Sequence, residues 1–265
     1  MVELRVAGQV VAEYVVEPDL DPTLSPRPYL HPVRTLGGVP VTDVLPEDHR
    51  WHLGASLAIQ DVAKANIWGG RTYVRDTGYT WLDDHGRIVH DEWRERTDGR
   101  VAHRLRWLDR AGATLLTEER VVAAAPAPGG WTLEFGYAVT APVDRDIELG
   151  SPATNGRPGN AGYGGFFWRL PLGTPEVFTA TVDGEEKVHG STEPWVGVRG
   201  DGYTLVFAGL AEGDHWFVRV SGYPGVCAAL AWERPLVVPA GTTLRRQHRV
   251  LVADGDLDRE TIHFP

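Results

Sequence analysis

Three of the ten histidines lie within the N-terminal part of the chain, at His31, His49 and His52, and Asp48 directly precedes His49. Imidazole titrates near neutral pH and can both give and take protons, which makes such a cluster suited to acid/base catalysis. A neighbouring carboxylate can fix the tautomer of a histidine ring. The residue types therefore predict that His31, His49, His52 and Asp48 are catalytic.

The same histidines raise the alternative of a metal site. His49 and His52 are three residues apart, a spacing that shares a face in a helix but points to opposite faces in a strand. Residues 51–59 have the pattern of a strand, so a metal clamp needs His49 in the preceding turn and His31 brought alongside. A third reading is that the histidines bond only to loop backbone. We favour acid/base use and predict neither a metal nor a cofactor.

Aromatic and polar residues around this cluster suggest a sugar as ligand. A sugar ring packs its C–H face on an aromatic ring while its hydroxyls pair with polar side chains. The tryptophans outside regular strand alternation and the long Gly-rich loop at 151–165 supply both types of group, and loops of this length are often functional. The predicted substrate-binding residues are Arg34, Trp51, Trp68, Asn155, Arg157, Asn160, Trp168 and Arg169.

Two carboxylates, Glu148 and Glu233, are flanked by apolar residues and are candidates for a catalytic base. Ion pairing of Glu233 with the adjacent Arg234 is the simpler reading, and we favour it slightly. The sequence does not decide which carboxylate, if either, acts as base.

Hydrophobic residues alternate with polar ones along most of the chain, as at 101–107, 131–139 and 203–207, which predicts half-buried antiparallel strands. Turn residues separate about fifteen candidate strands. The best helical candidate is short, at 61–65. We predict an all-β protein, a large antiparallel β-sandwich with very little helix, formed by a single domain over residues 1–265.

The composition excludes several classes of protein. The net charge is −10, which disfavours nucleic acid as a partner. The single cysteine, Cys227, lies in an apolar run and is expected in the core. No stretch is apolar enough to span a membrane, and the N-terminus lacks the pattern of a signal peptide. These features predict a cytoplasmic location.

Four blocks of sequence resemble the PmoA-like family of unknown function. They are RPYLHPVRTLGGVPVT (27–42), DHRWHLG (48–54), NIWGG (66–70) and GRPGNAGYGGFFWR (156–169). Through this family the chain is similar, at a distance, to galactose-mutarotase-like supersandwich proteins, which act on or bind sugars with His and Glu as acid and base. The stretch PLVVPAGTTLRRQHRVLV (235–252) looks like the closing strands of that fold.

The resemblance implies a shared pocket containing His31, Arg34, Asp48, His49, His52, Trp68 and Arg169. It does not identify the late glutamate base of the mutarotases. The family name refers to a membrane methane monooxygenase, and that activity is not carried over.

Three functions follow, in order of preference. The first is a carbohydrate-active isomerase or lyase that uses histidine acid/base chemistry on a sugar or an oxidised sugar, in the manner of an epimerase, mutarotase or hydratase. The second is a non-catalytic sugar-binding sandwich. The third is a His-ligated metal enzyme. A small carbohydrate is the expected partner, and a homodimer is the default for a soluble enzyme.

Overall fold

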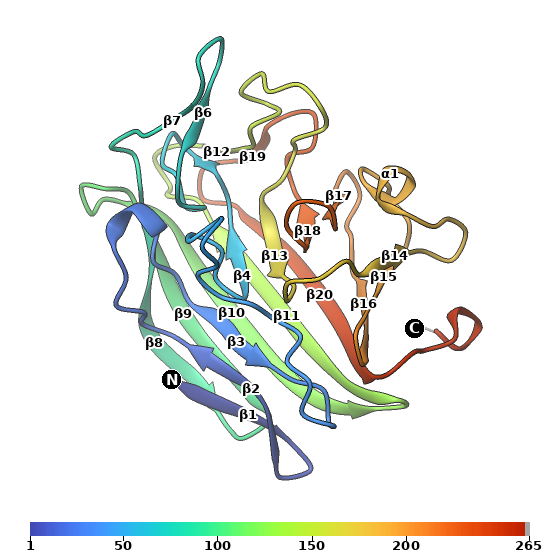
Figure 1. The fold of residues 1–265 in the computed structure, drawn as a ribbon. Coiled ribbons are helices and arrows are strands. Elements are labelled where there is room, and N and C mark those ends of the chain that lie inside the picture. Colours follow the sequence, from blue (N-terminus) through green and yellow to red (C-terminus); the bar gives the residue numbers. More distant parts are fainter. Residues whose placement is uncertain (263–265) are drawn as a thin grey trace.

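The computed structural model describes residues 1–262 and consists mainly of two large antiparallel sheets (Figure 1). The seven-stranded sheet runs in the order β1 (Val2–Val6), β2 (Gln9–Val15), β3 (Tyr29–Val33), β4 (Ala55–Ala58), β13 (Gly165–Arg169), β18 (Gly225–Ala229) and β17 (His215–Arg219). The eight-stranded sheet runs in the order β14 (Glu176–Phe178), β15 (Trp195–Gly200), β16 (Tyr203–Ala208), β20 (Thr243–Asp254), β11 (Gly130–Thr140), β10 (Thr114–Ala127), β9 (Arg100–Leu108) and β8 (Arg87–Arg96).

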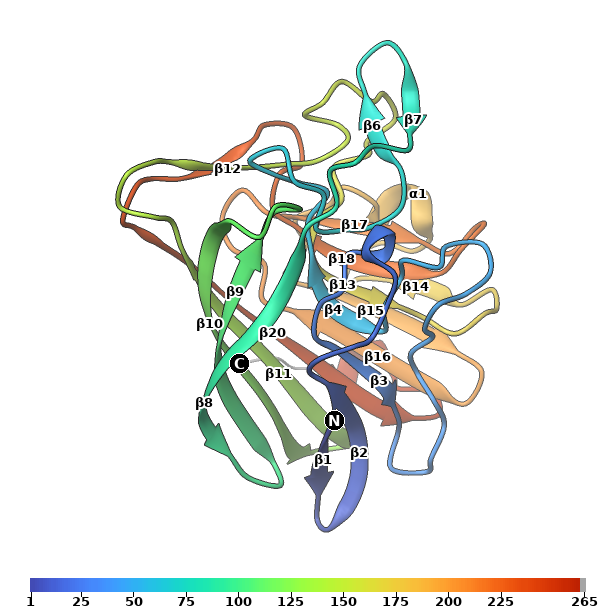
Figure 2. The same cartoon turned by 90° about the vertical axis from the view of Figure 1, so that its left-hand side faces the viewer.

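Two small sheets lie at one end of the sandwich. One contains β19 (Leu236–Val238), β12 (Ile147–Gly150) and β5 (Asp61–Val62), and the other is the hairpin of β6 (Thr72–Val74) and β7 (Gly78–Thr80). This hairpin projects beyond the large sheets in both views (Figures 1 and 2). Helix is limited to α1 (Glu185–Val188) and the 3-10 turns Pro22–Leu24 and Arg259–Thr261 within residues 1–262. The predicted all-β fold is confirmed.

The core lies between the two large sheets, and strand alternation fills it. In β11 the side chains of Trp131, Leu133 and Phe135 are buried, while Thr132 and Glu134 on the other face are half-buried. Residues of both sheets, from Leu4 to Val252, join one apolar cluster. Burial of apolar area at roughly 25 cal/mol per Å² is therefore the main force that holds the sheets together.

Two local predictions are wrong. Residues 61–65 do not form a helix, because Ala63 and Lys64 have left-handed backbone angles (φ 47° and 75°) that turn the chain directly after β5. The strand expected from Trp51 onward begins only at Ala55, and residues 51–54 belong to a turn in which Gly54 has a φ of 46°. This turn lifts His49 and His52 out of strand geometry.

Candidate functional site

A pocket of about 450 Å³ lies on the outer face of the seven-stranded sheet, away from the core. Loops that are distant in sequence meet around it: the turn before β4, the segment around β5, the β6–β7 hairpin, the loop before β13, and the end of β17 with the turn after it. The lining residues are Asp48, His49, Trp51, His52, Gln60, Trp68, Arg71, Tyr79, Trp81, Arg157, Tyr163, Phe217, Arg219 and Tyr223.

Strand alternation in β13 decides which residues reach this face. Phe167 packs with Trp68 and Tyr163 in a second apolar cluster beneath the pocket. Arg169, two residues on, shares that face and contacts His52. Trp168, between them, points to the core, where its indole N–H donates to the carbonyl of Val41 at 2.7 Å.

Asp48 and His49 form a hydrogen-bonded carboxylate–imidazole pair at the pocket wall. The distance from His49 Nδ1 to Asp48 Oδ2 is 2.7 Å. Burial raises the pKa of Asp48, but the bond from His49 and the charge of Arg169 outweigh it and hold this pKa below its usual value. Because an ionised carboxylate only accepts, His49 Nδ1 carries the hydrogen, and the neutral form of His49 therefore has the lone pair on Nε2.

His52 has the opposite arrangement. Arg169, which is fully buried, approaches His52 Nδ1 at 3.2 Å and Asp48 Oδ1 at 3.3 Å. A guanidinium only donates, so His52 Nδ1 must accept and its Nε2 carries the hydrogen. Burial lowers the pKa of His52 well below the usual value, and the charge of His49 when that ring is protonated, with the charges of Arg169 and Arg27, lowers it further. His52 is therefore a neutral hydrogen-bond donor at neutral pH.

The two imidazoles are stacked, with ring centroids 4.7 Å apart. Tyr223 packs against both rings, at 4.6 Å from His49 and 5.1 Å from His52. The site thus holds a proton acceptor and a neutral donor side by side, which is the division of roles that acid/base chemistry at adjacent atoms requires.

Aromatic rings form most of the remaining wall. The ring of Trp81 is 52% exposed and lies perpendicular to Trp51 at 6.4 Å. At the far side, the hydroxyls of Tyr79 and Tyr163 are 2.7 Å apart, and the buried Gln60 donates to Tyr163 at 3.1 Å. These rings offer apolar platforms beside polar groups, as a sugar requires.

A second buried arginine fixes the floor. Arg27 donates to the main-chain carbonyls of Ser25 and Trp68, both at 3.0 Å, and of Trp51 at 2.9 Å. Its side chain therefore ties together the two segments that carry the pocket tryptophans. Gly70 lets the segment after Trp68 pack directly against the Trp51 ring, because a Cβ at this position would lie 2.5 Å from that ring.

Six of the predicted site residues line the pocket, and Arg169 lies directly behind it. The six are Asp48, His49, Trp51, His52, Trp68 and Arg157. The structure thus brings together both halves of the site that the sequence placed far apart, residues 48–68 and 157–169. Whether these side chains bind or transform a substrate stays a prediction.

The other predicted residues lie elsewhere. His31 bonds to Thr42 Oγ1 at 3.0 Å, and Arg34 pairs with Glu13 at 3.2 Å. In the Gly-rich loop, Asn155 donates to Asp61 at 3.0 Å and the main-chain oxygen of Asn160 contacts His189 at 2.9 Å. Trp168 belongs to the core because of its strand parity. The shared pocket implied by the resemblance therefore lacks His31 and Arg34.

The candidate bases Glu148 and Glu233 are exposed and do not line the pocket. Among residues 1–262, no group of three or more His, Cys, Asp or Glu side chains is arranged to hold a metal ion. His31 lies outside the pocket with its Nδ1 bonded to Thr42, and the three-histidine cluster that the metal hypothesis needs is not found among these residues.

Sequence reasoning missed the lining residues that come from other strands and loops: Gln60, Arg71, Tyr79, Trp81, Tyr163, Phe217, Arg219 and Tyr223. Trp81, beside the Asp83-Asp84 turn, and Tyr163, inside the Gly-rich loop, carried a usable signal because both are aromatic residues in irregular segments. Phe217 and Tyr223 carried none, since only the pairing of β13 with β18 and of β18 with β17 brings them near His52.

Comparison with solved structures finds distant likenesses. A protein from Escherichia coli K12 proposed to be an aldose 1-epimerase is 10% identical, with a TM-score of 0.47 over 96% of this chain and 98% of that one. The heparan sulfate lyase HepC from Pedobacter heparinus is 12% identical, with a TM-score of 0.30 over 65% of this chain and 22% of the lyase. Likeness of this degree says nothing about what the chain binds or does.

No curated protein matches the chain. Within residues 1–262, none of the helices has the length and apolar character needed to cross a membrane. A family model matches residues 1–263, nearly the whole sequence, and its description carries no PmoA name. The chain belongs to DUF6807, a family of unknown function.

Proposed function

We propose that the protein is an acid/base enzyme that acts on a small carbohydrate, as an isomerase or a lyase. The observation that carries the proposal is the opposite polarity of the two stacked imidazoles: Asp48 leaves His49 Nε2 as an acceptor, and Arg169 leaves His52 Nε2–H as a donor. The aromatic walls favour a sugar ring as ligand.

In the proposed reaction His49 Nε2 removes a proton from a carbon next to a carbonyl group. The C–H electron pair moves into a carbon–carbon double bond, and the carbonyl π electrons move to oxygen, where His52 Nε2–H donates a hydrogen bond to the developing charge. Addition of a proton from water to the opposite face of the carbon gives an epimer, and His49 releases its proton to solvent. Alternatively, a substituent leaves the next carbon with its bonding electrons and takes up the proton held by His49, which gives an unsaturated product and makes the enzyme a lyase.

Proton NMR in deuterated buffer tests this proposal. The protein is incubated with aldoses, glycosides and their 3-keto derivatives, beside His49→Ala and His52→Ala variants. His215→Ala, a change outside the pocket, is the matched control. We expect deuterium to enter one carbon position with wild type and with the control. The rate of deuterium incorporation should be at least ~100-fold lower with either site variant. Equal exchange in wild type and His49→Ala contradicts the assignment of the base.

A non-catalytic sugar-binding role is the second candidate, favoured by the exposed Trp81 platform. It predicts that sugars bind without any deuterium exchange, and that His49→Ala binds as tightly as wild type.

The remaining expectations stay predictions: one domain over residues 1–265, a cytoplasmic location, a homodimer, and no metal or other cofactor. The PmoA-like name suggests no further activity.

A further inference from the structure

The pocket carries more positive charge than the rest of this acidic chain would suggest. The chain has a net charge of −10, yet three arginines line the pocket, Arg71, Arg157 and Arg219, against one carboxylate, Asp48. Asp48 is engaged by His49 and Arg169, and Arg219 pairs with Glu185 at 3.3 Å. Among the ion pairs of residues 1–262, none includes Arg71 or Arg157.

Both unpaired guanidinium groups rest on aromatic rings of the same segment. The Arg157 guanidinium carbon lies 5.0 Å from the centre of the Tyr79 ring, and Arg157 also donates to the Tyr79 hydroxyl at 2.8 Å. The Arg71 guanidinium carbon lies 6.0 Å from the centre of the Trp81 ring. Stacking on a ring orients a guanidinium but neutralises no charge, and it leaves N–H edges free for an anion.

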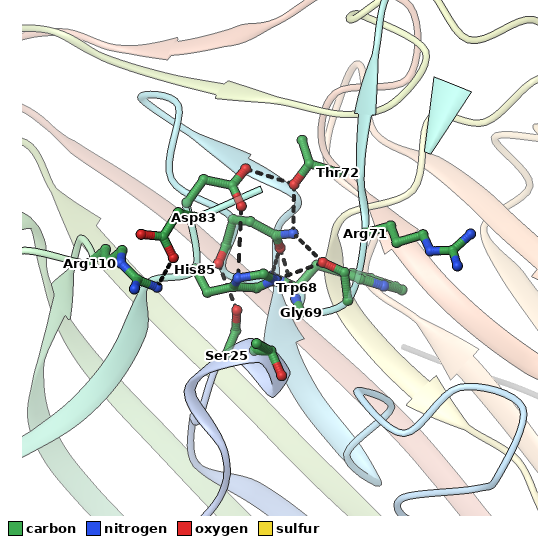
Figure 3. A network of polar contacts seen from close by, with 12 residues as sticks. Ser25, Trp68, Gly69, Arg71, Thr72, Asp83, His85 and Arg110 are labelled. Carbon is green, nitrogen blue, oxygen red and sulfur yellow. Dashed lines mark hydrogen bonds and ion pairs between the residues drawn. The ribbon is translucent and has the colours of Figure 1, made fainter. Parts of the chain in front are cut away.

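The backbone that carries Arg71 is held by buried polar side chains. Gly70, next to it, accepts hydrogen bonds at its carbonyl from His85 at 2.7 Å and from Asn66 at 3.3 Å. Gln60 donates to the carbonyl of Arg71 itself at 3.2 Å. Figure 3 shows polar contacts around His85 and Thr72, with the Arg71 side chain pointing away from them. A charge on such a rigid support is suited to selective recognition.

We propose that Arg71 and Arg157 bind an anionic group on the sugar, either the carboxylate of a sugar acid or a sulfate ester. This inference rests on the proposed function, because it names the substrate class of the same pocket. Arginine presents a planar fork of N–H donors that fits the oxygens of either anion. Two such groups with no carboxylate partner favour an anionic ligand over a neutral sugar, since a neutral sugar would leave both charges uncompensated when it covers them.

Binding measurements test the inference without requiring turnover. Calorimetric titrations of the full chain use D-glucuronate, glucose 6-sulfate and glucose at two salt concentrations. Arg71→Gln, Arg157→Gln and the double variant are compared with wild type. Arg75→Gln is the control. Arg75 is exposed, lies in the turn of the β6–β7 hairpin and does not line the pocket.

We expect one or both anionic sugars to bind at least tenfold tighter than glucose, and to bind more weakly at high salt. The double variant should lose that advantage, and the Arg75→Gln control should keep it. Which of the two sugars gains identifies the carboxylate or the sulfate as the anion. Equal affinity for all three sugars, or an anionic preference that survives the double variant, overturns the inference.

The two proposals fail separately. If anionic sugars bind through the arginines but no sugar exchanges deuterium, the anion site stands and the acid/base role of His49 does not. If a neutral sugar exchanges deuterium through His49 and anionic sugars gain no affinity, the acid/base function stands and the anion site does not.

Discussion

Mild acid should destabilise this protein strongly, because two histidines are buried in the core as neutral rings. Burial, with the charges of Arg120 and His90, lowers the pKa of His103 to about 2. Burial, with the charge of Arg246, lowers the pKa of His248 to about 3. In the unfolded chain an ordinary histidine titrates near ~6.5.

The hydrogen bonds around His103 explain why it resists a proton. Arg120 donates to the hydroxyl of Tyr14 at 3.2 Å, so that hydroxyl donates to His103 Nε2 at 2.9 Å. The other ring nitrogen of His103 lies 3.0 Å from His90 Nδ1 and donates to it. A proton on His103 Nε2 would face the Tyr14 hydroxyl and require that one bond to reverse, so that the hydroxyl accepts from both His103 and Arg120 and a second positive charge is buried next to the guanidinium.

The sign and the size follow from proton linkage. Below pH ~6.5 the unfolded chain binds protons at these two positions and the folded chain does not, so stability is fully present above that pH and decreases as the pH falls toward the folded pKa values. Between pH 7 and pH 5 each histidine costs about 1.9 kcal/mol, or about 4 kcal/mol for the pair. A typical domain has a total of only ~5–15 kcal/mol. His52, also held neutral, adds to the loss.

Urea denaturation at pH 7, 6 and 5 measures this effect, with tryptophan fluorescence as the signal. His248→Leu removes one of the two titrating rings, so its loss of stability between pH 7 and pH 5 should be about 1.9 kcal/mol smaller than that of wild type, whatever its stability at pH 7. A wild-type loss below about 1 kcal/mol would refute the reasoning, because it would mean that both rings accept protons in the folded state.

Three further predictions concern the pocket. Arg169→Met leaves His52 Nδ1 without its donor, so we expect the free energy of unfolding, measured by fluorescence, to fall by roughly 1–3 kcal/mol. The rate of any deuterium exchange, measured by NMR, should fall by ~100-fold. Trp81→Ala should change stability by less than ~1 kcal/mol, since the ring is 52% exposed, but weaken sugar binding by ~3–10-fold in calorimetry. Arg27→Met leaves four main-chain carbonyls, those of Leu24, Ser25, Trp51 and Trp68, without a donor and should cost more than ~3 kcal/mol in urea denaturation; a smaller loss would show that these segments hold their positions without it.

The strands were predictable because their signal is local. Alternation at 131–139 and 101–107 corresponds to β11 and β9, where inward residues such as Trp131 and Trp107 are fully buried. The error at 61–65 has a local cause as well, but one that composition hides, since neither Ala63 nor Lys64 belongs to the residue types that favour left-handed backbone angles.

The candidate site was predictable only where sequence neighbours stay neighbours in space. Asp48, His49, Trp51 and His52 reach the pocket together because a single turn carries them. Residue type alone misplaced Trp168. Its Gly-rich surroundings suggested a site residue, but β13 pairs on both sides with buried strands. Because side chains alternate along a strand, Trp168 points to the core and its neighbour Arg169 points to the site.

The two buried arginines of the site have different environments, and this difference gives them separate roles. One maintains the shape of the pocket, and the other orders its histidines. Arg27 bonds to main-chain carbonyls and a serine, so it fixes the segments of Trp51 and Trp68 without placing a carboxylate near them. Arg169 is bonded to His52 and paired with Asp48, which in turn is bonded to His49. The same type of group therefore acts on both imidazoles, on His52 directly and on His49 through Asp48. Because one guanidinium supports the walls and the other orders the histidines, Arg27→Met should first weaken folding and Arg169→Met should first alter the proton chemistry of the pocket.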